Sequence, residues 1–119
     1  MGITTETTDT TTFKATVNLE DVYKVDVRIC EVVAAERVPK KDKLLKLTIN
    51  TGSDERTAIT NVGGFYEPEQ LVGKRYPFIL NLEPKIIANI ETAAMIVAIS
   101  TRNGVELFET PAEVGSVVI

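Results

Sequence analysis

The sequence of 119 residues contains no histidine and no tryptophan, and its single cysteine is Cys30. Without histidine, it lacks the side chain that proteins use most often as a metal ligand and general base. One cysteine cannot form an internal disulfide, which favours an intracellular, cytoplasmic protein. Cys30 has no histidine to activate it, so we expect it to be a small buried apolar side chain. These absences indicate a protein that is not an enzyme.

Other common signals are missing as well. The longest apolar run, residues 93–99, is far shorter than the ~18 residues that a membrane-spanning helix needs. The N-terminal residues do not combine a basic segment with an apolar one, so no secretory signal is predicted. No glycine-rich loop with a common phosphate-binding spacing occurs. We expect no contact with a membrane, no cofactor and no metal ion.

Basic side chains are in the minority, because 17 acidic residues against 13 basic ones leave a net charge of −4. A domain that binds nucleic acid through its overall charge is usually basic, so any such binding here depends on local placement. Residues 4–12 consist of seven threonines and two acids. Such a segment has little to bury, which predicts a disordered tail over residues 1–17 and one domain over residues 18–119.

Alternation of apolar and polar residues predicts an all-β fold. Asn18 can cap a short helix at 18–23, and a helical turn is expected at 68–73. An Asn103-Gly104 turn predicts a hairpin, and the apolar run 92–100 predicts a strand buried on both faces. Strands are expected over residues 25–38, 45–50, 56–62, 75–80, 92–100 and 105–108, with an extra edge strand at 117–119. This order is typical of a five-stranded OB barrel, although other small barrels fit almost as well.

Basic residues gather in the predicted connection between the first two strands. Five lie within ten residues, namely Arg37, Lys40, Lys41, Lys43 and Lys46. In OB folds this connection and the one between strands four and five border the face that binds oligonucleotides. The second connection, residues 81–91, adds Asn81, Lys85 and Asn89. A lysine-rich turn in solvent explains the first cluster equally well. The scarcity of aromatic residues favours folded RNA over single strands as the ligand.

Several motifs resemble the tRNA-binding domain family, which includes the C-terminal domain of methionyl-tRNA synthetases, free-standing homodimers and the chaperone CsaA. The motifs lie at residues 25–29, 36–39, 42–47, 65–74, 81–84 and 90–95. The resemblance implies an OB fold that binds tRNA without catalysis, alone as a homodimer or in trans with an aminoacyl-tRNA synthetase. The helix at 18–24 and the C-terminal end would build the dimer. A domain that only docks onto a synthetase is a further alternative.

By motif position, the resemblance also implies a set of site residues. Lys43, Asn61, Asn81, Thr92 and Met95 would lie on the binding face with Arg28 and Arg56 nearby, and the candidate site is completed by Lys40, Lys41 and Lys85. Burial of Met95 in the core and a structural ion pair between Asp26 and Arg28 are equally good alternatives.

The chain departs from the family at one loop. Members carry a lysine and an arginine in an A-K-L-R-G motif, where this chain has Ile86, Ala88 and, for the glycine, Asn89. Lys85 is kept one position earlier. The apolar Ile86-Ile87-Ala88 segment and the acidic balance suit the alternative function, a CsaA-like chaperone that binds unfolded or export-bound polypeptide.

Overall fold

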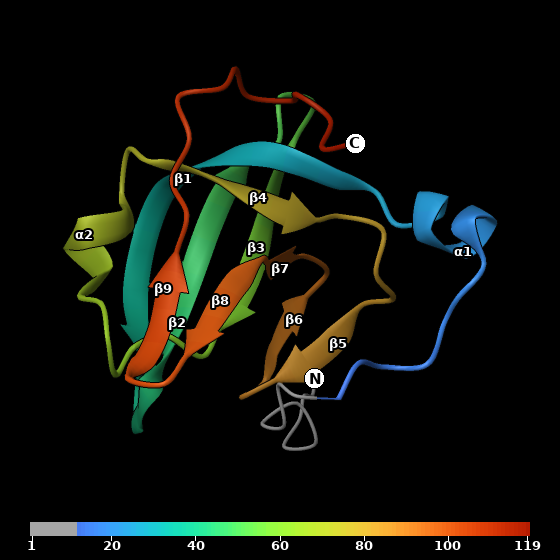
Figure 1. Ribbon diagram of the computed structural model, residues 1–119. Helices are drawn as coiled ribbons and strands as arrows, with labels where there is room; N and C mark the ends of the chain where they lie inside the picture. Colours follow the sequence, from blue (N-terminus) through green and yellow to red (C-terminus); the bar gives the residue numbers. More distant parts are fainter. Residues whose placement is uncertain (1–11) are drawn as a thin grey trace.

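A computed structural model describes residues 12–119 of the chain (Figure 1). The two short helices are α1 (Leu19–Tyr23) and α2 (Pro68–Leu71). The nine strands are β1 (Val27–Val38), β2 (Lys41–Asn50), β3 (Glu55–Thr60), β4 (Arg75–Ile79), β5 (Lys85–Ile87), β6 (Ile90–Thr92), β7 (Met95–Ile96), β8 (Ala98–Thr101) and β9 (Gly104–Leu107). The predicted tail over residues 1–17 falls mostly outside the described residues.

The predicted all-β barrel of the OB type is confirmed. Five strands form an antiparallel sheet in the order β3-β2-β1-β4-β7, and β3 also lies against β6 and β7, which curls the sheet into a barrel. Strands β5 and β6 form one hairpin, and β8 and β9 form another. The single helix between the third and fourth strands is α2, as the position of Pro68 predicts.

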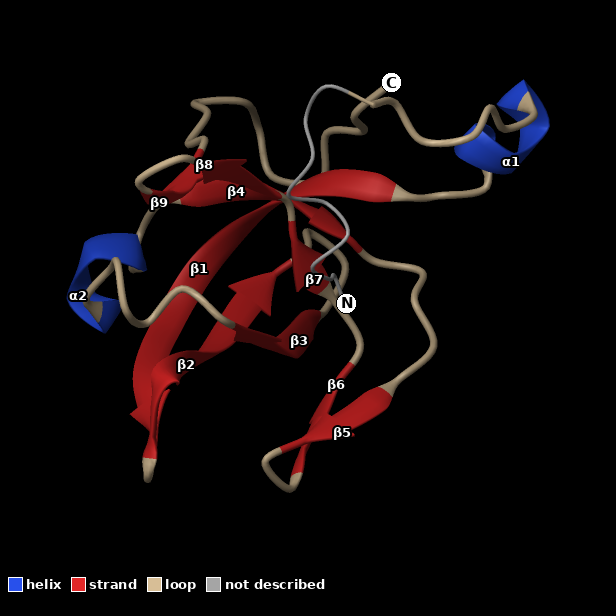
Figure 2. Cartoon of the chain, turned by 60° about the horizontal axis from the view of Figure 1, so that its bottom comes forward, coloured by secondary structure: helices blue, strands red, loops and turns tan. Residues whose placement is uncertain are grey.

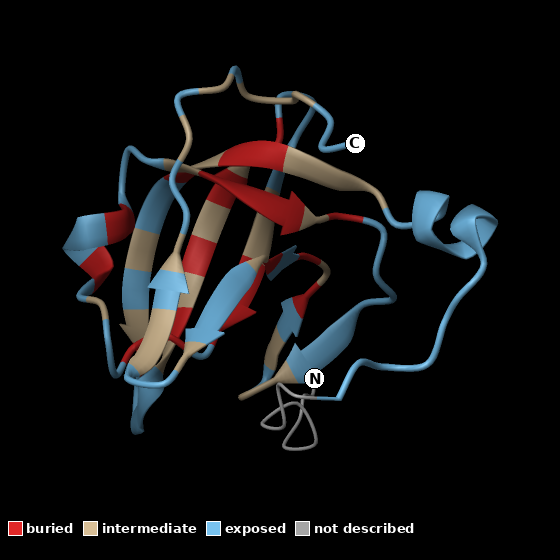
Figure 3. Ribbon diagram, in the orientation of Figure 1, coloured by how far each residue is buried: buried red, intermediate tan, exposed pale blue. Residues whose placement is uncertain are grey.

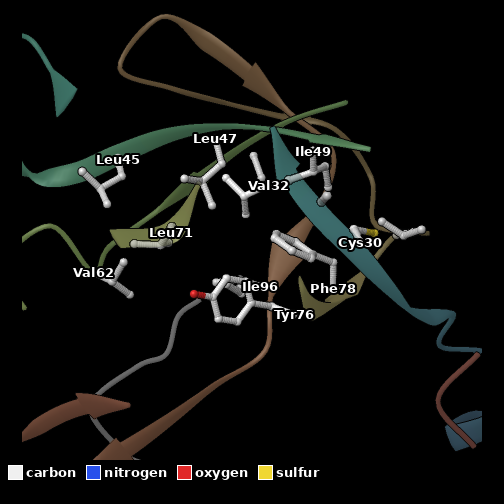
Figure 4. Packing of buried hydrophobic residues seen from close by; sticks show 13 residues of the cluster. Cys30, Val32, Leu45, Leu47, Ile49, Val62, Leu71, Tyr76, Phe78 and Ile96 are labelled. Carbon is white, nitrogen blue, oxygen red and sulfur yellow. The ribbon is translucent and has the colours of Figure 1, made fainter. Parts of the chain in front are cut away.

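The core comes from the inward-facing residues of the barrel strands. Leu45, Leu47 and Ile49 alternate with polar residues along β2, and their side chains point into the cluster that Leu71 and Phe78 complete from the other side (Figure 4). Buried positions therefore appear as stripes along the strands in Figure 3. Cys30 belongs to this core, as predicted, and burial raises the pKa of its thiol to about 11. The thiol is therefore protonated at neutral pH, which suits packing rather than nucleophilic attack.

The hairpin of β8 and β9 covers the barrel and is held at two points. Val105 and Leu107 pack against the core, and the Leu107 N–H donates to the Tyr66 hydroxyl at 3.1 Å. Gly104 allows the Phe65 ring to approach, because a Cβ atom at position 104 would lie 2.5 Å from the ring. The hairpin predicted from Asn103-Gly104 is thus confirmed.

The predicted strand at 92–100, buried on both faces, is wrong. The segment divides into β6, β7 and β8, which pair with β5, β4 and β9 in turn. The Thr92 hydroxyl donates to the Ala94 carbonyl at 3.3 Å, which turns the chain between β6 and β7. Met95 and Ile99 are 40% and 45% exposed. Apolar composition alone could not reveal that the run changes partners twice.

Two predicted connections are also shorter than expected. The basic segment after β1 is a two-residue turn, Pro39-Lys40, because β2 begins at Lys41 rather than at residue 45. Pro39 fixes its own φ, and Lys40 takes a φ of 65° to complete the turn. The second predicted connection, residues 81–91, is shorter because it contains most of the β5–β6 hairpin.

The predicted edge strand at 117–119 is reduced to one bridge between Arg28 and Val117.

The β5–β6 turn carries conformational strain that a substitution should relieve. Ala88 and Asn89 have φ values of 53° and 65°, the pattern of a type I′ turn, and alanine is disfavoured in this region by about 1–2 kcal/mol. We expect Ala88→Gly to raise the free energy of unfolding by about 0.5–1 kcal/mol, since the relief exceeds the added freedom of the unfolded chain. Urea denaturation measures the change.

The matched control is Ala34→Gly, on exposed β1 backbone with no positive φ. It should lower the free energy of unfolding by roughly 0.5–1 kcal/mol, as glycine does within a strand. An equal loss of stability in both variants would contradict the strained turn.

Candidate nucleic-acid interface

Three lysines stand exposed at the end of the β1–β2 hairpin. Lys41 and Lys43 share the alternation of Leu45, but here the strand extends past the core, so both side chains meet solvent instead of the barrel interior. Lys40 lies in the turn itself. The end of the hairpin therefore carries three cations close together, with Asp42 as the one acid among them.

These three lysines have no acidic partner within the described residues, unlike nearly half of the basic residues of the chain. All 13 basic residues lie within residues 12–119, and six make ion pairs: Lys24, Arg28, Arg37, Lys46, Arg56 and Arg75. The other seven make none within the described residues: Lys14, Lys40, Lys41, Lys43, Lys74, Lys85 and Arg102. The end of the β1–β2 hairpin, residues 39–43, holds three of the seven and is called the β1–β2 turn below. It is therefore the place where an approaching phosphate meets the most available positive charge.

Both arginines of the predicted site bind other parts of the chain. Arg28 Nε donates to Asp26 Oδ1 at 2.9 Å, which is the ion pair considered from the sequence. Arg56 Nε contacts Asp54 at 3.2 Å, and its Nη1 donates to the Leu80 carbonyl at 2.8 Å. The Thr51 hydroxyl, together with Arg56, holds the pKa of the Asp54 carboxyl below its usual value. Each arginine is therefore fixed by internal partners.

Asn81 and Thr92 also use their polar atoms internally. Asn81 Oδ1 accepts from the Asp26 N–H at 2.8 Å and Nδ2 donates to the Lys24 carbonyl at 2.6 Å, which ties the loop after β4 to the segment after α1. Thr92 is only 7% exposed, and its hydroxyl accepts from the Ile59 N–H at 3.2 Å. This bond joins β6 to β3, where the barrel closes.

The remaining candidates are accessible. Asn61 follows β3, Lys85 opens β5, and both are exposed, as is Met95 in β7. The Gly63 N–H donates to the Lys43 carbonyl at 2.8 Å, which holds the segment after Asn61 against the start of β2. Met95 thus does not occupy the core position considered for it.

The predicted site residues fall into two groups. The β1–β2 turn and the β5–β6 hairpin project toward the same end of the molecule in both views, with β3 between them (Figures 1 and 2). Lys40, Lys41, Lys43 and Asn61 belong to this end. Arg28 and Asn81 lie elsewhere, beside the C-terminal segment and α1. A surface that combines all ten predicted residues does not form.

Sequence reasoning did not identify the outward side of the β5–β6 hairpin as a surface. Ile86 is 75% exposed, and it lies directly opposite Glu91. The sequence did contain one indication of this surface, because Ile86 stands where the family motif has a lysine. Within residues 12–119, no group of three or more metal-ligating side chains occurs, and no helix there is long and apolar enough to cross a membrane.

Comparisons with known proteins agree with the fold. Residues 27–118 match a family described as "Putative tRNA binding domain". The methionine–tRNA ligase of Deinococcus radiodurans is 45% identical over 82 residues, covering 69% of this chain and 12% of the ligase. That of Cytophaga hutchinsonii is 39% identical over 101 residues, covering 85% of this chain and 15% of the ligase. The chain therefore spans less than a sixth of these relatives.

Solved structures with the same fold are shorter proteins. A methionyl-tRNA synthetase related protein from Pyrococcus horikoshii has a TM-score of 0.85 at 30% identity, over 89% of this chain and 100% of that one. The chaperone CsaA from Bacillus anthracis has a TM-score of 0.77 at 25% identity, over 88% of this chain and 100% of that one. The similarity thus extends over nearly all of the barrel.

The position of the basic turn depends on Gly63. A Cβ atom added there would lie 2.6 Å from the Asp42 carbonyl oxygen and 2.9 Å from the Lys43 carbonyl carbon. We expect Gly63→Ala to push the start of β2 away and to lower the free energy of unfolding by about 1–3 kcal/mol. Chemical denaturation measures this loss.

Gly64→Ala is the control, because a Cβ atom at position 64 has no neighbour within 4 Å. This adjacent substitution should change stability by less than about 0.5 kcal/mol, as surface changes usually do. If Gly63→Ala were as harmless as Gly64→Ala, the close contact with β2 would be refuted.

Proposed function

The chain belongs to the tRNA-binding domain family, and we propose that it binds tRNA without catalysing a reaction, with the β1–β2 turn contacting the phosphate backbone. The observation that carries this proposal is the group of three lysines that make no ion pair within residues 12–119, in a chain of net charge −4. Phosphate contacts fix where a protein sits on RNA but do not identify the bases. Recognition of this kind suits a folded RNA of defined shape.

The acidic balance determines how strong this binding can be. Each phosphate that a lysine neutralises releases counterions and adds roughly 0.7–0.9 to the slope of log K against log salt. Three lysines with Lys85 predict a slope of about −3, far smaller than that of a strongly basic protein. Binding is therefore expected at low ionic strength and weakens steeply as salt is added.

We also propose that the protein acts as a homodimer in the cytoplasm. None of the residues of α1 is buried, although a helix of five residues is not stable without packing. The C-terminal segment lies nearby, because the Val118 N–H donates to the Val27 carbonyl at the start of β1. Both segments expose apolar side chains: Leu19, Val22, Tyr23, Val117, Val118 and Ile119. A second copy that covers them would stabilise α1.

Cooperation in trans with an aminoacyl-tRNA synthetase completes the proposal. The matched relatives are methionine–tRNA ligases, of which this chain resembles only a small part. A separate binding domain can raise the local concentration of tRNA near such an enzyme. The CsaA-like alternative, binding of unfolded polypeptide, is not favoured, because the matched family and the ligase relatives both point to tRNA.

Removing the charge of the β1–β2 turn tests the proposed function. We expect the triple variant Lys40→Gln, Lys41→Gln and Lys43→Gln to bind total tRNA more weakly, with a salt slope reduced by about 1 for each lysine. Fluorescence anisotropy at a series of salt concentrations measures both quantities.

The control removes three charges elsewhere, by Lys14→Gln, Lys74→Gln and Arg102→Gln. These three residues also make no ion pair in the part of the chain that the structure describes. The net charge of this control equals that of the test variant, so only the location differs. An equal change of the salt slope in both triple variants would show that the overall charge of the protein, and not the β1–β2 turn, determines tRNA binding. Absence of tRNA binding by the unmodified protein at the lowest salt would refute the function itself.

A charge placed on α1 tests the homodimer. We expect Val22→Lys to convert the dimer to a monomer, because an unpaired ammonium group buried in an apolar interface costs several kcal/mol. Sedimentation velocity measures the mass. Val72→Lys, at a similarly exposed valine after α2, should leave the mass unchanged. A protein that is already monomeric at high concentration would contradict the proposal.

A further inference from the structure

The β5–β6 hairpin has one side against the barrel and one side free. Lys85 pairs with Thr92 and Ile87 with Ile90, and the buried Thr92 hydroxyl bonds to β3. Side chains alternate along a strand, so the intervening pair, Ile86 and Glu91, lies on the opposite side and points outward. Both residues of this pair are exposed, and Glu91 makes no ion pair within the described residues.

The outward pair, Ile86 and Glu91, is chemically unsuited to binding a phosphate group. Directly opposite residues of an antiparallel pair have Cβ atoms only about 4.5–5.5 Å apart, so Ile86 and Glu91 form one small surface. The carboxylate of Glu91 repels phosphate and can only accept hydrogen bonds. Ile86 offers an apolar contact that water leaves readily.

We propose that this surface receives one unstacked nucleobase of the bound RNA, and that the base carries an exocyclic amino group. The face of the base would lie on Ile86, and its amino group would donate to the Glu91 carboxylate, as carboxylates do with the N4 amino group of cytosine. This inference rests on the proposed binding of tRNA and names a second contact within it. Uracil has no amino group, so the pair would discriminate against it.

The location of the hairpin supports an RNA base as the occupant. Its tip projects toward the same end of the molecule as the β1–β2 turn (Figures 1 and 2). Lys85 precedes Ile86 in the sequence, is exposed and makes no ion pair within residues 12–119, although strand alternation directs its side chain to the other side of the hairpin. An RNA held by the β1–β2 turn can therefore reach the outward pair at the same end of the molecule.

Another hairpin of the same molecule provides a matched control. In the β8–β9 hairpin, Ile99 lies directly opposite Glu106, so the same two residue types form the same cross-strand pair. Figure 2 separates this hairpin from β5 and β6. Substitutions in the two pairs are chemically identical and differ only in location.

The experiment compares Ile86→Ala with Ile99→Ala by titration with total tRNA over a series of salt concentrations. Stacking on a side chain does not release counterions, so Ile86→Ala should weaken binding about 5- to 10-fold at every salt concentration with the slope unchanged. Ile99→Ala should have no effect. Ile86→Thr, which keeps a β-branched strand residue, should weaken binding in the same direction, and its circular dichroism should match that of the unmodified protein.

The role of Glu91 is tested with two hairpin RNAs that differ only in the loop, one all cytidine and one all uridine. The unmodified protein should prefer the cytidine loop, and Glu91→Gln should lose most of this preference because an amide can also donate to uracil. Glu106→Gln should keep it.

Three results would overturn the inference. The first is equal affinity of Ile86→Ala and Ile99→Ala for tRNA while binding itself remains strong and salt-dependent, a result that leaves the proposed function intact. The second is unchanged tRNA binding by Ile86→Ala together with reduced binding of an unfolded polypeptide, which would assign the surface to protein. The third is the absence of tRNA binding in every variant and in the unmodified protein, which would refute the proposed function as well.

Discussion

The barrel depends on the hydrogen bonds of one strand, β1, whose twelve residues need partners on both edges. Strand β4 pairs with residues 27–31 and β2 pairs with residues 31–38, so the strand changes its main partner in the middle, and its register shifts between Val32 and Ala34. On the edge of β1 that faces away from β4, Ile29 bonds to the C-terminal segment: its N–H donates to the Ser116 carbonyl, and its carbonyl accepts from the Gly115 N–H. Because β1 is bent and pairs with β4 in its first half and with β2 in its second half, its two ends lie in different surroundings. One end extends the β1–β2 hairpin past the core, and at the other the C-terminal segment bonds to the start of β1, which follows α1 in the chain.

The two kinds of basic residue take separate roles at these ends. Four of the five arginines make ion pairs, whereas six of the eight lysines make none in the part of the chain that the structure describes. The planar guanidinium group holds several acceptors in fixed directions, as Arg56 does with Asp54 and the Leu80 carbonyl. A lysine at the end of a hairpin remains a mobile point charge. The chain therefore keeps a local basic surface at the β1–β2 hairpin despite its excess of acid, because the lysines there are not paired with acids within the described residues.

Much of the fold follows from the sequence because its signals are local. Period-two alternation predicts β1 to β4, Asn18 predicts the cap of α1, and Pro68 predicts α2. The β5–β6 hairpin escapes prediction because its strands have three residues each and its turn uses Ala88, a residue type that seldom adopts a positive φ. The bonds of Asn81 and Thr92 span 55 and 33 residues, so their structural roles cannot be derived from neighbours in the sequence. Of the basic residues predicted for the first connection, only Lys40 lies between β1 and β2, and the others lie in these two strands, since β2 begins at Lys41 and not at residue 45.

The same acidic excess affects which RNA can bind. A flexible polyanion that adapts to the protein surface meets more acids than free lysines, so it gains little from non-specific contact. A folded RNA can place phosphates at the β1–β2 turn and keep its other phosphates away from the acids, because its shape is fixed. Replacement of basic side chains by Ile86 and Ala88 lowers the electrostatic part of binding further and leaves an apolar contact in its place. The outcome is a surface on which shape and base contacts contribute a larger share of the selectivity than charge does.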